Sequence, residues 1–65
     1  MTLREAKERV AENTRRYPHL ADDFAGLWEL CVAEIDEGGS PQREIDSLLN
    51  DMEDLIVEWS EISAS

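Results

Sequence analysis

Apolar residues recur every three or four positions in three separate stretches of the chain, with polar residues between them. This spacing places the apolar side chains of each stretch on one face of an α-helix. We therefore expect helices near residues 3–17, 20–37 and 41–62. The expected fold class is all-α, a small three-helix bundle that forms one domain over residues 1–65.

The first two helices differ in the width of their apolar faces. The first is expected to begin at a capping box made by Thr2 and Glu5 and to end before Pro18. Its apolar face is thin, so weak packing is expected. The second has a broad apolar arc, which predicts a central helix with a neighbour on each side. Its main stripe is Leu20, Phe24, Leu27, Trp28, Cys31 and Ile35, widened by Ala21, Ala25, Leu30 and Val32.

The segment "EGGSPQREI" carries the signals for one helix to end and another to begin. Gly38 or Gly39 is suited to the left-handed residue that follows a helix, Ser40 to an N-cap and Pro41 to a first helical residue. So short a connection predicts that the second and third helices form an antiparallel hairpin. The third helix carries the apolar series Ile45, Leu48, Leu49, Met52, Leu55, Ile56, Trp59 and Ile62.

The two tryptophans, Trp28 and Trp59, lie on the facing stripes of this hairpin. They are expected to anchor the core, or to anchor an interface if the monomer leaves them uncovered. Because chains of this size seldom bury enough apolar surface alone, the sequence also predicts a homodimer.

Charge is distributed unevenly along the chain, which has sixteen acids and six bases for a net charge of −10. Residues 1–19 hold five bases and three acids, a net of +2, whereas residues 20–65 hold one base and thirteen acids, a net of −12. So negative a segment repels a phosphate backbone, which argues against direct nucleic-acid binding. It attracts a basic protein, and such a protein is the expected partner.

A row of carboxylates runs beside the apolar stripe of the third helix. At about 100° per residue these side chains share one flank, and no lysine interrupts them to relieve their mutual repulsion. The row is either a binding surface for a cationic partner or a solvated helix face. The candidate partner-binding residues are Glu44, Asp51, Asp54, Glu58 and Glu61, with Ser47 completing the row.

Signals for catalysis are sparse. His19 has no serine or cysteine partner in a motif, and Cys31 lies on an apolar stripe where a packed small hydrophobe is expected. We therefore expect no enzyme activity, no catalytic residue, no metal site and no cofactor. The remote alternative is a Mg²⁺-dependent helical nucleotide hydrolase, because two E-x-x-E pairs resemble metal-binding carboxylate pairs. These pairs are Glu34 with Glu37 and Glu58 with Glu61.

One cysteine excludes an internal disulfide, and neither a signal-peptide pattern nor a membrane-length apolar run is present. A cytoplasmic protein without membrane contact is expected. The leading hypothesis is a non-enzymatic acidic binding or inhibitor protein that occupies a basic, for example nucleic-acid-binding, surface of a partner. Nucleic-acid mimics, antitoxins and immunity proteins share this physical logic. The alternative is a small homo-oligomeric adaptor that recruits its partner through an apolar helix face.

Overall fold

The computed structural model describes residues 1–64, and all of its regular structure is helical. The elements are α1 (Leu3–Arg16), a short 3-10 turn η1 (Pro18–Leu20), α2 (Ala21–Asp36) and α3 (Pro41–Ala64). The predicted all-α helical bundle is confirmed. The differences from the expected boundaries are small: residues 18–20 form a separate turn, and α3 continues two residues further.

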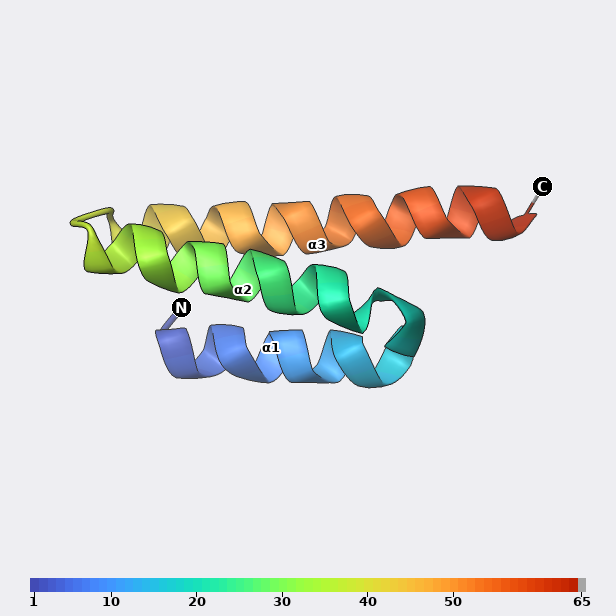
Figure 1. Ribbon diagram of the computed structural model, residues 1–65, viewed down its shortest axis with the longest axis horizontal. Helices are drawn as coiled ribbons and strands as arrows, with labels where there is room; N and C mark the ends of the chain where they lie inside the picture. Colours follow the sequence, from blue (N-terminus) through green and yellow to red (C-terminus); the bar gives the residue numbers. More distant parts are fainter. Residues whose placement is uncertain (65) are drawn as a thin grey trace.

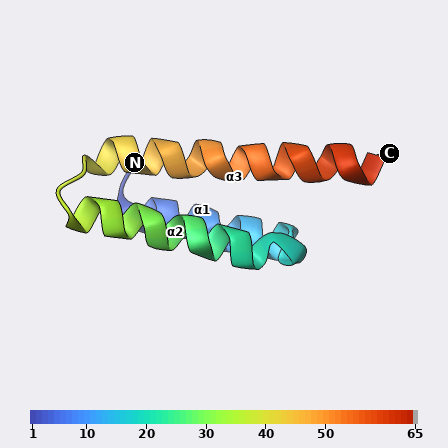
Figure 2. The ribbon, with the colours of Figure 1, turned by 45° about the horizontal axis from the view of Figure 1, so that its top comes forward.

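The three helices lie side by side, with α2 in contact with both α1 and α3 (Figures 1 and 2). The chain reverses direction at residues 37–40, at the end of the molecule opposite the C-terminus (Figure 1). α3 has 24 residues and α2 has 16. At 1.5 Å per residue, α3 is longer by about 12 Å, and its last turns extend past the rest of the bundle.

α1 begins at the predicted capping box. The backbone N–H of Glu5 donates to Thr2 Oγ1 at 3.2 Å, and the backbone N–H of Thr2 donates to Glu5 Oε1 at 3.1 Å. The backbone and hydroxyl donors of Thr2 stabilise the carboxylate and lower the pKa of Glu5 below its ordinary value. A further pair of bonds joins the N-terminus to the first turn of α3, with Gln42 Nε2 donating to the Met1 carbonyl at 2.9 Å.

The turn between α2 and α3 closes as a Schellman motif. Gly38 adopts a φ of 105°, the left-handed conformation that favours glycine. Its N–H donates to the Ile35 carbonyl at 3.1 Å, and the N–H of Gly39 donates to the Glu34 carbonyl at 2.8 Å. These bonds satisfy carbonyls that the end of α2 leaves open, and α3 then begins at Pro41 as predicted.

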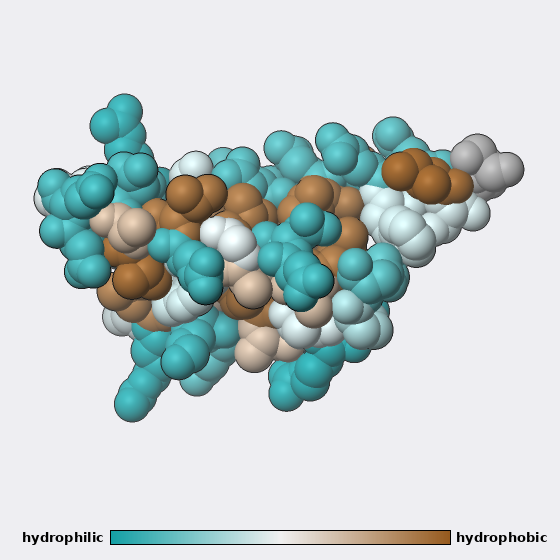
Figure 3. All heavy atoms as spheres, viewed as in Figure 1, coloured by the Kyte–Doolittle hydropathy of each residue, from teal (hydrophilic) through white to brown (hydrophobic). Residues whose placement is uncertain are grey.

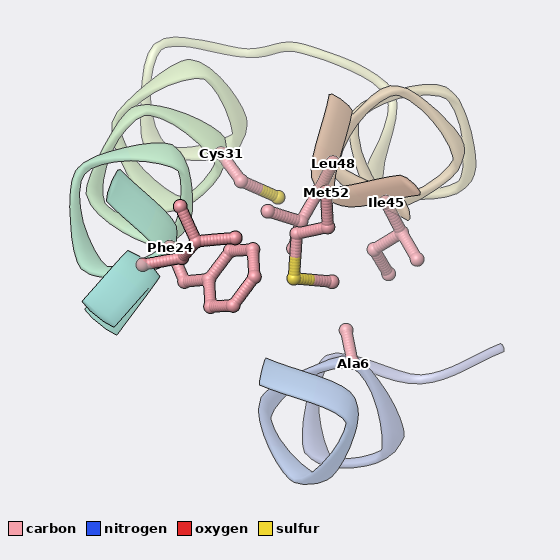
Figure 4. Packing of buried hydrophobic residues seen from close by; sticks show 7 residues of the cluster. Ala6, Phe24, Cys31, Ile45, Leu48 and Met52 are labelled. Atoms are coloured by element: carbon pink, nitrogen blue, oxygen red, sulfur yellow. The ribbon is translucent and has the colours of Figure 1, made fainter. Parts of the chain in front are cut away.

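The core forms where the three helices meet. Phe24 of α2 and Ile45 and Met52 of α3 are the largest fully buried side chains. α1 contributes a single buried residue, Ala6, which points toward the side chains of α3 (Figure 4). The thin apolar face predicted for the first helix is confirmed. The buried cluster consists of Ala6, Leu20, Phe24, Cys31, Ile45, Leu48 and Met52.

The apolar stripe of α3 is covered along only part of its length. Trp59 is 37% exposed and Ile62 is 68% exposed, because α3 extends past the ends of the neighbouring helices. The expectation that Trp59 anchors the core is therefore wrong, whereas Trp28 is half-buried against the cluster. On α2, Leu30 was expected to widen the buried arc, but it is 62% exposed.

The turn can be tested with alanine at three glycines. Gly38→Ala should lower the free energy of unfolding by about 1–2 kcal/mol, because a Cβ disfavours the left-handed conformation. Gly39→Ala should also destabilise, since its Cβ would lie 2.7 Å from the Glu34 carbonyl oxygen. Gly26→Ala is the matched control: a Cβ there meets nothing within 4 Å, so higher helix propensity should raise stability by up to about 1 kcal/mol. Urea denaturation measures all three, and a fully stable Gly38→Ala variant would contradict the described turn.

Candidate functional site: an acidic groove between α2 and α3

Two adjoining pockets of about 320 Å³ and about 300 Å³ lie between α2 and α3. Both are lined by Leu27 and Asp51, so they form one continuous depression, which we call the acidic groove. Its α2 wall and floor consist of Asp23, Leu27, Leu30, Cys31 and Glu34. Its α3 wall and floor consist of Glu44, Ser47, Leu48, Asp51, Asp54, Leu55 and Glu58.

The α2 wall is a row at i, i+4, i+7 and i+11 spacing, which places its members on one helix face. Asp23 and Glu34 stand at the two ends of this row, and Leu27 and Leu30 lie between them. Leu30 is the most exposed apolar residue of α2 that lines the groove. The wall therefore presents an apolar centre with a carboxylate at each end.

The α3 wall carries most of the carboxylate row predicted from the sequence. Asp51, Asp54 and Glu58 are exposed, and Glu44 is partly buried beside the start of the helix. These four line the groove. The fifth predicted residue, Glu61, does not, because it lies one turn further along α3, where α2 no longer forms an opposite wall.

The charge of the groove has one sign. Six of its lining residues are acids, and none is lysine, arginine or histidine. Two of the acids, Asp23 and Glu34, come from α2 and were absent from the predicted row. Carboxylates on facing walls of one depression add their potentials, so a cation is attracted more strongly here than beside a single helix.

Cys31 lies beneath the groove with 4% of its surface exposed, as expected of a packed thiol. Burial raises the pKa of the Cys31 thiol above its ordinary value, and the negative charge of Glu44 raises it further. The neutral thiol is a poor nucleophile, so the groove contains no activated sulfur.

The two E-x-x-E pairs of the hydrolase alternative lie far apart. Glu34 and Glu37 are at the end of α2 beside the turn, whereas Glu58 and Glu61 are in the distal part of α3. Within residues 1–64, no three histidine, cysteine or acidic side chains gather into a set that could hold a metal ion.

An aromatic contact between η1 and α3 was not predicted. The ring of His19, in η1, lies 4.0 Å from the ring of Trp59 between centroids, with a tilt of 41°. Tyr17 meets His19 edge-on at 6.4 Å. This cluster joins the α1–α2 junction to α3. His19 and Trp59 are 40 positions apart in the sequence, so no local pattern could predict their contact.

The chain matches no protein-family model, no curated protein and no solved structure. Across residues 1–64, none of the helices combines the length and apolar character needed to cross a bilayer.

The raised pKa of Cys31 predicts a pH dependence of stability. Because the pKa of Cys31 is higher in the folded chain than in the unfolded chain, its full contribution to the unfolding free energy is present below the unfolded pKa of about 9. This contribution is lost as the pH rises through the folded pKa. Between pH 8 and pH 11, roughly the range around a thiol pKa, the unfolding free energy should fall more steeply for the wild type than for Cys31→Ala. Denaturation at each pH measures both slopes, and parallel curves would show that Cys31 titrates as a solvated thiol.

Proposed function

We propose that this protein is a non-enzymatic acidic binding protein whose groove takes up a basic surface of a protein partner. The observation that supports the proposal is the charge of the groove, which is lined by six acids and no base. Partner surfaces of this kind include those that bind nucleic acids, because the acidic groove and a phosphate backbone both present closely spaced negative charges. The proposal therefore includes inhibitors that imitate nucleic acid, antitoxins and immunity proteins, acting in the cytoplasm.

Both chemical components of the groove favour lysine and arginine. Asp51, Asp54 and Glu58 are spaced at i, i+3 and i+7, so neighbouring charges repel within the free protein and a cation relieves that repulsion. The apolar stems of lysine and arginine can cover Leu27 and Leu30 while their charged ends reach the carboxylates.

Replacing three carboxylates separates a binding role from a folding role. In Asp51→Asn/Asp54→Asn/Glu58→Gln the stability should hold or rise by a few tenths of a kcal/mol, because like-charge repulsion is removed. Affinity for the basic partner should fall by about 1–3 kcal/mol for each carboxylate that the partner buries. Calorimetric titration with the partner purified from the native host measures affinity, and urea denaturation measures stability.

The control for this variant carries the same charge change on outer faces. Glu29→Gln/Asp36→Asn/Asp46→Asn also removes three exposed acids, but none of them lines the groove. It should bind the partner nearly as well as the wild type does. Affinity of the wild type should also weaken steeply between low and physiological ionic strength. Full affinity in the groove variant would overturn the charge-led proposal.

A second candidate function is a homo-oligomeric adaptor, and the exposed end of α3 favours it. We propose that α2 and α3 act as an antiparallel hairpin whose distal α3 stripe pairs with a second copy. Leu55, Trp59 and Ile62 follow one another at i, i+4 and i+7, and the last two are 37% and 68% exposed. Burial of these side chains in a dimer would remove apolar surface from water, a gain that depends little on salt.

Sedimentation at micromolar concentration tests this candidate. A dimer should sediment at twice the chain mass of 7.4 kDa, in low and high salt alike. Ile62→Gln should shift it toward the monomer, whereas Val57→Gln, an equally polar change on the opposite flank of α3, should leave it unchanged. A wild-type monomer across this range would remove the homo-oligomeric adaptor.

A further inference from the structure

We infer that the element taken up by the acidic groove is a single basic amphipathic α-helix of the partner. Its apolar residues lie against Leu27 and Leu30, and its lysines and arginines face the carboxylates of α3. The inference rests on the proposed function and specifies the shape of the partner in addition to its charge.

The α2–α3 pair has two sides, and a helix already occupies one of them. Figure 4 shows Ala6 of α1 directed at the core from one side, while Cys31 and Leu48 lie at the side of the core away from α1. Cys31 and Leu48 also line the acidic groove. The groove is therefore the second face of the same helix pair, and such a face accepts a helix at an interaxial distance of about 8–10 Å.

A helix suits this groove better than an extended segment does. The backbone groups along α2 and α3 are hydrogen-bonded within their own helices, so the walls offer no free donors or acceptors to an extended chain. An extended segment on the apolar floor would lose hydrogen bonds to water without replacement. A helix brings its backbone already hydrogen-bonded and contributes only side chains.

The walls specify the pattern of that helix. On α2 the distance from Asp23 to Glu34 is eleven residues, or about 16 Å at 1.5 Å per residue, which corresponds to three helical turns. The complementary helix has apolar residues at its centre to meet Leu27 and Leu30, with basic residues toward both ends. Figure 3 shows hydrophobic surface along the α2–α3 side of the molecule with hydrophilic side chains around it.

A second copy of this chain is a poorer occupant of the groove. Its one segment with net positive charge is residues 1–19, which includes α1. The apolar side of α1 is already used against its own core, through Ala6 and the half-buried Val10. The exposed positions of α1 include three glutamates, Glu5, Glu8 and Glu12, which the acidic groove would repel.

Two synthetic peptides of identical composition test the inference. Both contain leucine, alanine, lysine and arginine; in one the leucines form a helical stripe flanked by bases, and in the other the order is shuffled so that no apolar face exists. The amphipathic peptide should bind the full chain about tenfold more tightly in fluorescence anisotropy and gain helicity on binding. Amide NMR shifts should change at Leu27, Leu30 and Asp51, but not at Arg9 or Asn13, which line a separate pocket.

Variants at two exposed apolar residues complete the test. Leu30→Gln should weaken binding of the amphipathic peptide by about tenfold and leave the melting temperature unchanged, since Leu30 is 62% exposed. Val57→Gln, the matched control at a residue 49% exposed and outside the groove, should have no effect on this binding.

Results that would overturn the helical partner can be distinguished from results that would overturn the proposed function. Equal binding of both peptides, with loss of both in the Asp51→Asn/Asp54→Asn/Glu58→Gln variant, would overturn the helix and leave a charge-led groove in place. Binding of neither peptide would overturn the helix as well, while titration of the natural partner against that same variant still decides the broader proposal. Self-association that Leu30→Gln abolishes would assign the groove to a second copy and also overturn the inference.

Discussion

The pairing of α2 with α3 is the interaction on which the rest of the structure depends. Phe24 and Cys31 from one helix and Leu48 and Met52 from the other supply most of the buried side chains. A chain of 65 residues has enough apolar surface for one such helix–helix interface, and the paired helices leave a groove on each side of it. α1 covers one groove with little more than Ala6. The groove on the other side of the pair is the acidic groove.

The elements that local sequence signals determine were predictable. The capping box at Thr2, a left-handed glycine at position 38 or 39 and the start of α3 at Pro41 each depend on a few neighbouring residues. The structure has each of them, with Gly38 as the left-handed residue. Coverage of the α3 stripe was not predictable in the same way. It depends on how far α2 reaches along α3, and this overlap is a property of the tertiary structure that the spacing of apolar residues does not reveal. Trp59 therefore matched the core pattern and yet lies at the edge of the bundle.

The candidate site was predictable only on one helix at a time. A period of about 100° identified the flank shared by Asp51, Asp54 and Glu58. The same rule gives no information about Asp23 or Glu34, because the register between α2 and α3 determines that they lie opposite the carboxylates of α3. The contact between His19 and Trp59 depends on this register too. Periodicity thus gives one wall of the groove, and tertiary pairing supplies the opposite wall and leaves Glu61 outside the groove.

The groove also combines two features that folding alone disfavours. Repulsion among the α3 carboxylates opposes the helix that carries them, and the exposed Leu30 places apolar surface in water. Either feature alone is common on protein surfaces. Here they face each other across one depression, and a ligand with both positive charge and an apolar face would relieve them together. Departures from the folding optimum that gather on one surface are characteristic of binding sites. Charge alone would favour any polycation, and Leu30 alone any apolar surface, so their combination is the reason for proposing an amphipathic basic helix as the partner.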